Sequence, residues 1–316
     1  MYRDVINKIS AIVFASVLAV PTIALSDEPI PVVATFSILG DMVKRVGGEH
    51  VKVTTLVGPD GDTHVYQPTP ADARAVSETR ILFVNGLDFE GWIERLVEAS
   101  EFDGMRVVTT EGIEPIKFEE DEHHDEDEHH DDHGHGQHHH GAHDPHAWQS
   151  LVNAINYVDN ITAALAKVSP ANAAAFYENR TTYVAEIEAL EMTLKKKIGS
   201  LPENRRTVVT SHDAFQYFGR DYGLTFLAPQ GLSTESEASA QDVAQLIEQI
   251  REKGIKAVFV ENIADSRLLQ QIANETGAKI GGTLYPGALS GPDGPAPTYL
   301  DMMNHNASTL VEALSK

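Results

Sequence analysis

Three isolated histidines lie at points where predicted elements begin or end. His64 follows a predicted strand in the segment GDTHVYQPTP, His212 follows another in VVTSHDAF, and His146 comes just before a predicted helix in DPHAW. In open parallel sheets, ligands bind beyond the carboxyl ends of the strands, and a loop can bring His146 to the same place. Imidazole nitrogens suit Zn2+ and its neighbours. Each histidine alone would more often be a surface residue, but together they predict a metal site.

Ten more histidines lie in one acidic segment, in which residues 119–132 include ten carboxylates and no basic residue. Residues 119–141 contain almost no apolar side chains, so the segment cannot bury enough surface to offset the entropy of ordering it. We interpret residues 119–143 as a disordered, low-complexity loop that collects zinc at weak sites. The alternative is a solvated acidic spacer without a role in metal binding. The candidate accessory residues are His123, His124, His129, His130, His133, His135, His138, His139, His140 and His143.

The rest of the chain alternates predicted strands with predicted helices. This alternation runs from residue 31 to about residue 110, and it begins again near residue 206. Such a pattern is typical of parallel sheets covered by helices on both faces, so we expect two α/β lobes. Between them, apolar residues at helical spacing predict one helix of nearly thirty residues within 169–199, long enough to span both lobes. The predicted boundaries are 27–168 for the first lobe and 200–316 for the second.

Residues 1–26 have the pattern of a secretory signal peptide, with two basic residues, an apolar run and a small-x-small ending. We expect cleavage after Ser26 and a soluble protein in a bacterial periplasm. An uncleaved membrane anchor is the alternative, but polar residues and a proline interrupt the apolar run. The sequence has no cysteine for a lipid anchor, a disulfide or a thiolate ligand.

The formal net charge is -23 at pH 7, and much of it comes from the histidine-rich segment. This balance argues against nucleic acid and anionic membrane surfaces as partners. The sequence contains no H-E-x-x-H, G-x-S-x-G or P-loop motif, and it has no Cys/His pair. We therefore expect that the protein is not an enzyme.

Four segments, DTHVYQPTPAD, DPHAW, SHDAFQYF and TYLDMMNHN, together resemble the substrate-binding proteins of zinc and manganese ABC importers. These proteins form cluster A-I, which includes periplasmic zinc-binding proteins, and the resemblance covers nearly the whole mature chain. It implies two (β/α) lobes joined by one long rigid α-helix, with the metal in a cleft between the lobes.

The resemblance also implies a set of ligands. His64, His146 and His212 match the family's first three ligand positions, and a histidine at the third position favours zinc because manganese relatives commonly have a glutamate there. Many relatives have an aspartate at the position of Pro297, so we expect another carboxylate as the fourth ligand. Asp293 is the first candidate and Asp301 the second, whereas Glu261 is a possible supporting or transient ligand.

The resemblance thus implies that the protein captures Zn2+ as transported cargo and delivers it to an ABC permease with its ATPase. We expect a monomer, and a periplasmic zinc metallochaperone is a possible further partner. The alternatives are a manganese carrier of the same family, a zinc-dependent hydrolase, and a metal buffer or adhesin without an importer. Four protein ligands would leave no open position for a reactive water, which argues against the hydrolase.

Overall fold

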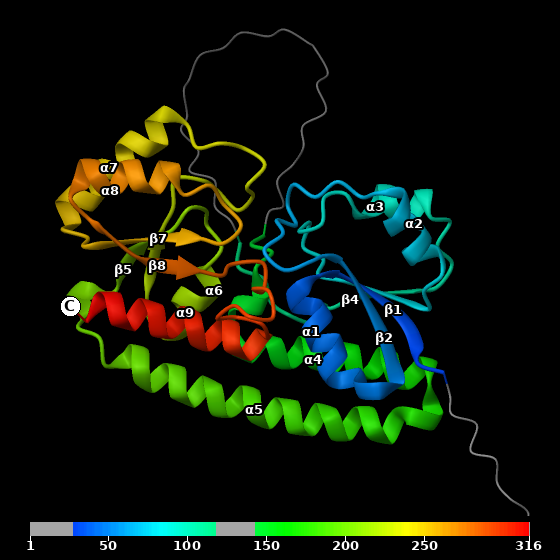
Figure 1. Ribbon diagram of the computed structural model, residues 1–316. Coiled ribbons are helices and arrows are strands. Elements are labelled where there is room, and N and C mark those ends of the chain that lie inside the picture. The colour runs from blue at the N-terminus through cyan, green and yellow to red at the C-terminus, as the bar shows by residue number, and fades with distance from the viewer. Residues whose placement is uncertain (1–27, 118–142, 316) are drawn as a thin grey trace, which may run out of the picture.

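The computed structural model describes residues 28–117 and 143–315 (Figure 1). The predicted signal peptide, and the histidine-rich segment as far as residue 142, lie outside these ranges. Within the described residues, no helix is both long and apolar enough to cross a membrane.

The first lobe contains a four-stranded sheet in the order β2-β1-β3-β4. All its strand pairs are parallel, and Val32 of β1 lies between Val53 of β2 and Ile81 of β3. Strand β3 is buried at every position, as expected for a strand covered on both faces. The strands are β1 (Ile30–Phe36), β2 (Val51–Val57), β3 (Ile81–Val84) and β4 (Met105–Val108), and the helices are α1 (Ser37–Gly47), α2 (Pro70–Ser77) and α3 (Ile93–Ala99).

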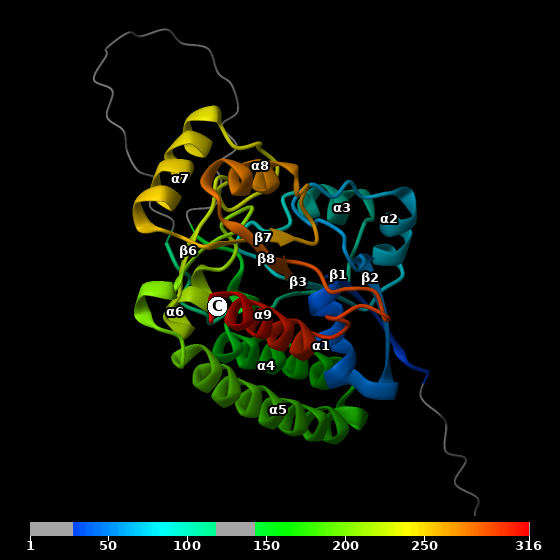
Figure 2. The ribbon, with the colours of Figure 1, turned by 60° about the vertical axis from the view of Figure 1, so that its left-hand side comes forward.

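The second lobe repeats this plan with a parallel sheet in the order β6-β5-β7-β8. Figure 2 shows α7 and α8 on one side of this sheet and α9 on the other. The strands are β5 (Thr207–Val209), β6 (Thr225–Leu227), β7 (Ala257–Glu261) and β8 (Lys279–Leu284), and the helices are α6 (Gln216–Tyr222), α7 (Ala240–Lys253), α8 (Arg267–Thr276) and α9 (Tyr299–Leu314).

Two helices connect the lobes, α4 (Leu151–Val168) and α5 (Ala173–Gly199). Helix α5 has 27 residues, so it is about 40 Å long at 1.5 Å per residue. It packs against α1 of the first lobe and α9 of the second, and Figure 1 shows it running beneath both. Its buried residues, which recur at helical spacing, are Phe176, Tyr183, Ile187, Leu194 and Ile198. The two lobes thus share one long supporting helix, as the family resemblance implied.

The hydrophobic core is continuous across the lobes. One cluster of buried side chains contains residues of both sheets and of α4, α5 and α9, and a smaller one lies under α7 and α8. Trp148, which is fully buried, donates from its indole Nε1 to the carbonyl oxygen of Pro286 at 2.8 Å and so ties the start of α4 to the second lobe. The lobes are therefore packed against each other rather than joined by a linker alone.

Strands and helices alternate in both lobes, as predicted. Helix α3 begins at Ile93, a few residues after a turn in which Gly86, Leu87 and Asp88 all have positive φ angles. At the start of α5, a short 3-10 turn at Pro170–Asn172 precedes the α-helix.

Candidate metal centre

The three isolated histidines meet between the lobes. His64 lies in the loop after β2, His146 lies in the segment that leads into α4, and His212 lies just beyond β5. The positions of His64 and His212 agree with the rule that loops at the carboxyl ends of parallel strands form binding sites. One nitrogen of each ring lies within 4.8 Å of the other two, and no other group of this kind occurs in residues 28–117 and 143–315.

The cluster is buried and compact. His64 is 7% exposed, whereas His146 and His212 have no exposed surface. The Nε2 atoms of His64 and His146 are 3.3 Å apart. Two nitrogens bound to one tetrahedral Zn2+ at about 2.05 Å would be about 3.3 Å apart, so this pair has the spacing that zinc requires.

Asp144 orients the ring of His146. One oxygen of its carboxylate, Oδ1, accepts a hydrogen bond from the backbone N–H of His146 at 2.9 Å and lies 2.8 Å from the ring Nδ1. This contact leaves the ring Nε2 to face His64. Burial raises the pKa of Asp144 to about 7, while the hydrogen bond from His146 opposes the shift.

Glu261, at the end of β7, holds His212 in the same way. Its Oε2 lies 2.6 Å from Nδ1 of His212, and its Oε1 accepts hydrogen bonds from the backbone N–H groups of Ser211 and His212. Because an ionised carboxylate can only accept, Nδ1 carries the proton when the ring is neutral, and Nε2 then keeps its lone pair. Nε2 of His212 is buried and has no hydrogen-bond partner among the described residues. Such an orphaned acceptor fits a metal ligand.

The three imidazoles do not share one protonation behaviour. Burial lowers the pKa of His64 well below its usual value, and the charges of His146 and His212 lower it further. Burial and the charge of His212 lower the pKa of His146. Burial also acts to lower the pKa of His212, but the charge and hydrogen bond of Glu261 outweigh it, so that this pKa is raised. At neutral pH, His64 and His146 are therefore ready to bind a cation, and His212 is the ring for which protons compete.

Aromatic side chains enclose one side of the cluster. The ring of Phe89 packs edge-to-face against His64 and His146, with centroid distances of 4.9 and 5.9 Å. Trp148 packs against both Phe89 and His146. This apolar wall lowers the local polarity, which strengthens any bond between an imidazole and a cation in the cluster.

The two carboxylates predicted as fourth ligands lie elsewhere. Asp293 is exposed in a loop that is closed by a hydrogen bond from Ser290 N to Ala296 O, and it is not part of the histidine group. Asp301 caps α9, because its carboxylate accepts from the hydroxyl of Thr298 at 2.6 Å and its N–H donates back to that hydroxyl. A role for Asp293 stays a prediction, and it requires the loop to move.

Glu261 and His143 are the other predicted residues that lie within the described part of the chain. Glu261 contacts Nδ1 of His212, on the far side of the ring from Nε2. This is where a residue that supports the ligand, one of the two roles predicted for Glu261, would lie. His143 pairs with Lys117 in an isolated antiparallel bridge at the base of the histidine-rich segment. The remaining nine accessory histidines, from His123 to His140, lie outside the described residues.

Sequence reasoning missed Asp144 and Asp62. Each lies two residues before a histidine of the cluster and accepts from the backbone N–H of that histidine at 2.9 Å. The repeated pattern Asp-x-His in DTH and DPH was the available signal.

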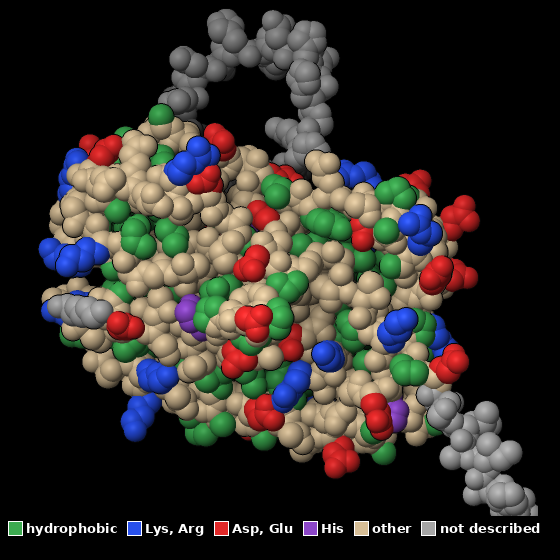
Figure 3. All heavy atoms as spheres, viewed as in Figure 1, with side chains coloured by type: hydrophobic (Ala, Val, Ile, Leu, Met, Phe, Trp, Pro, Cys, Tyr) green, Lys and Arg blue, Asp and Glu red, His purple; other side chains and the backbone are tan. Residues whose placement is uncertain are grey.

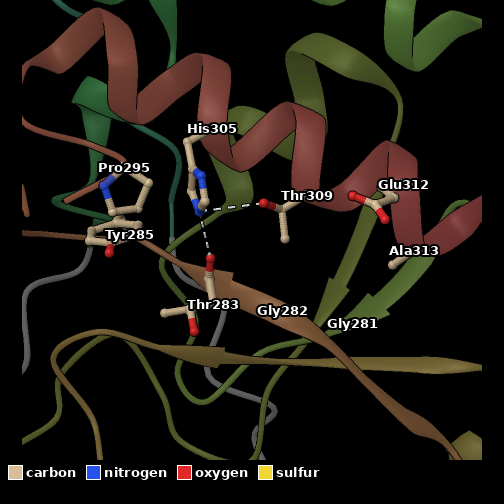
Figure 4. A pocket seen from close by; sticks show the side chains of 9 residues that line it. All are labelled: Gly281, Gly282, Thr283, Tyr285, Pro295, His305, Thr309, Glu312 and Ala313. Carbon is tan, nitrogen blue, oxygen red and sulfur yellow. Dashed lines mark hydrogen bonds between the residues drawn. The ribbon is translucent and has the colours of Figure 1, made fainter.

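A separate cavity of about 390 Å³ lies between β8 and α9 (Figure 4). Its His305 contacts the carbonyl oxygen of Thr283 at 3.0 Å and the hydroxyl of Thr309 at 3.4 Å. None of the three clustered histidines lines this cavity, so it is distinct from the metal centre.

The molecular surface shows acidic and basic side chains interspersed across the face drawn in Figure 3. No extended basic area is visible on this face.

Comparisons with known proteins agree with this geometry. The family model described as the periplasmic zinc-uptake complex component A (ZnuA) matches residues 32–313. The iron-binding protein YfeA of Yersinia pestis is 32% identical over 285 residues, which cover 90% of this chain and 86% of YfeA. The manganese-binding lipoprotein MntA of Bacillus subtilis is 34% identical over 294 residues, which cover 92% of this chain and 91% of MntA.

A solved structure, the periplasmic zinc binding protein TroA from Treponema pallidum, has the same fold, with a TM-score of 0.81. It is 28% identical to this chain, and the match covers 92% of this chain and 100% of TroA. The names of these three relatives refer to three different metals. The chain therefore belongs to the ZnuA family of metal-binding substrate-binding proteins, which serve ABC importers outside the cytoplasm and are not enzymes.

Proposed function

We propose that this protein captures Zn2+ with His64, His146 and His212 and delivers it to an ABC permease for import. The observation that carries the proposal is the set of three buried imidazoles, which converges without a carboxylate among the described residues. Nitrogen ligands favour zinc, whereas Mn2+ prefers sites that are richer in oxygen. The 3.3 Å spacing of two Nε2 atoms also suits a tetrahedral ion.

The fourth ligand in this proposal is Asp293, supplied by movement of the loop at residues 290–296. A carboxylate would complete a closed tetrahedral site that stores the ion and leaves no position for a reactive water. Asp301 does not fit this role, because its carboxylate caps α9. A metal-bound crystal structure tests this assignment directly.

Manganese or iron is the second candidate, because the relatives YfeA and MntA carry those metals in their names. Glu261 or Asp144 would have to leave its histidine to supply the oxygen ligand that these ions favour. Competition between Zn2+ and Mn2+ for the purified protein separates the two candidates. Displacement of bound Zn2+ by a modest excess of Mn2+ would refute the preference for zinc.

Variants of the cluster test the site itself. We expect His64→Ala and His212→Ala each to abolish the tightest class of Zn2+ sites in a calorimetric titration, because each removes one of the three histidines that meet among the described residues. A chain that lacks residues 119–141 is the matched comparison, and it should keep the tight site while losing weak sites. The loss of the tight site in that shortened chain would instead assign it to the histidine-rich segment.

The remaining features of the proposal concern the path of the metal. We infer that residues 1–26 direct export to the periplasm and that the protein acts there as a soluble monomer. The soluble form is supported by the absence of a cysteine to which a lipid could be attached. The histidine-rich segment would raise the local zinc supply or accept zinc from a metallochaperone. Fractionation of cells followed by mass determination of the mature protein tests the first of these statements.

A further inference from the structure

The loop that carries His64 is bonded to the opposite lobe. The backbone N–H of Asp60 donates to the carbonyl oxygen of Leu289 at 2.9 Å, and the side-chain amide of Asn262 donates to Oδ1 of Asp60 at 2.9 Å. Asp60 has a φ of 56°, a left-handed conformation that directs this contact at the tip of the loop. The position of the first-lobe loop thus depends on groups of the second lobe.

A third bond between the lobes involves Asp62, two residues before His64. Its Oδ2 accepts from the hydroxyl of Thr234 at 2.6 Å, and Thr234 lies between β6 and α7 of the second lobe. Its Oδ1 accepts from the backbone N–H of His64 at 2.9 Å. One carboxylate therefore connects the backbone of a metal-centre histidine to the opposite lobe.

Asp144 provides an internal comparison, since it occupies the same position relative to His146. Asp144 uses one oxygen for both the backbone and the ring of its histidine, and its Oδ2 is buried without a partner among the described residues. Asp62 uses its second oxygen for Thr234 instead. The same local pattern thus orients an imidazole in one case and joins two lobes in the other.

We propose that Asp62 is a positioning residue whose bond to Thr234 holds the His64 loop against the second lobe and so slows the release of the bound metal. This inference rests on the proposed function, because it takes His64 as a ligand. The physical reason is that His64 can leave the ion only if its loop moves, and the loop cannot swing away from the second lobe while the charged hydrogen bond is intact.

The test is a comparison of Zn2+ release rates after mixing the loaded, full-length protein with an excess of chelator. Thr234→Val removes the bond between the lobes but leaves the bond from Asp62 to His64 in place. We expect release to be about tenfold faster, the size of effect that a hydrogen bond to a charged group supports. Asp62→Asn should accelerate release at least as much, and the double variant should release little faster than Asp62→Asn alone.

Ser233→Ala is the matched control. Ser233 is adjacent to Thr234, and within the described part of the chain its hydroxyl accepts a hydrogen bond only from the backbone N–H of Glu235 in the same segment. Its release rate should equal that of the wild-type protein. The absorption spectrum of bound Co2+ should be the same in Thr234→Val as in the wild type, because the ligands do not change.

Three outcomes would overturn the inference. If the wild-type protein binds Zn2+ tightly but Thr234→Val releases it at an unchanged rate, this inference is refuted and the proposed function is not. A Co2+ spectrum changed by Asp62→Asn, with no effect of Thr234→Val on release, would make Asp62 a direct ligand. Failure of the wild-type protein to hold Zn2+ would refute the proposed function itself and this inference with it.

Discussion

At the scale of single residues, the proposed metal centre depends on carboxylates that lie behind its histidines. Asp144 and Glu261 each contact Nδ1 of a histidine and so leave Nε2 to face the centre. Such partners fix the tautomer and the orientation of the ring, and their loss typically lowers metal affinity by about ten- to a hundredfold. In the proposed site the histidines would supply the donor atoms, and the carboxylates would hold the rings so that these atoms can bind a metal ion.

Glu261→Gln should both weaken metal binding and change its pH dependence. The side-chain amide can present its NH2 group to Nδ1 of His212, which would move the ring proton to Nε2, the atom that must bind the ion. We therefore expect affinity at pH 8 to fall by about ten- to a hundredfold. Competition titrations at several pH values provide the measurement.

The sign of the pH effect follows from the raised pKa of His212. In the wild-type protein, protons should occupy this ring at a higher pH than they occupy an ordinary histidine, and we expect Zn2+ affinity to decrease there. Without the charge of Glu261, burial remains and lowers the pKa, so that the decrease should occur at lower pH. Asp265→Asn, an exposed change in the same lobe, should leave the profile unaltered. An equal pH profile in Glu261→Gln would show that His212 is not the ring at which protons compete.

At the scale of elements, the turn after β3 controls one wall of the site. Gly86, Leu87 and Asp88 have φ angles of 88°, 54° and 59°, which is strained for the two that are not glycine. The buried carboxylate of Glu90 holds this turn by accepting from Asn85 N, Gly86 N and the hydroxyl of Thr35. The turn places Phe89 against His64 and His146.

Glu90→Gln should destabilise the fold. A glutamine has one acceptor oxygen in place of two, so at least one buried N–H would lose its partner and the strained turn would lose its support. We expect the free energy of unfolding to decrease by about 2–4 kcal/mol, measured by urea denaturation. Glu94→Gln is the control, because Glu94 is exposed and its ion pair with Arg106 contributes little. Equal effects of the two substitutions would contradict the role assigned to Glu90.

At the scale of the whole molecule, the packing between the lobes limits how far they can separate. The continuous core, the shared helix α5 and the bond from Trp148 to Pro286 all cross the boundary. Tyr299 of α9 adds a hydrogen bond to the carbonyl oxygen of Trp148 at 2.7 Å. Wide hinge opening would expose buried apolar surface, so metal exchange must proceed mainly through loops and a modest tilt of the lobes.

Small-angle X-ray scattering tests this expectation. The scattering profiles of the full chain with Zn2+ and after removal of Zn2+ should superimpose, because the packing between the lobes opposes a large rigid-body rotation. His212→Ala, exposed to the same zinc concentration, controls for effects of the ion on other parts of the chain. A clear decrease in the radius of gyration that requires an intact cluster would instead indicate hinge closure.

Much of the fold could be predicted from the sequence, since periodic apolar residues reveal helices and strands that bury one or both faces. The strained turn at residues 86–88 could not, because its conformation is imposed by the distant Thr35 hydroxyl together with Glu90. The three histidines could be selected because they lie at the ends of predicted elements. Asp293 could not be placed, because the position of a loop rich in glycine and proline depends on tertiary contacts rather than on local pattern.

The sequence by itself determined the chemistry of the candidate ligands, the alternation of strands and helices, and the family resemblance, because each of these depends on residue type and local spacing. Only the tertiary structure decided which groups meet. It brought His212 to Glu261 across 49 positions of the chain and Asp62 to Thr234 across 172. Such contacts depend on how two lobes pack, and no local periodicity encodes that packing.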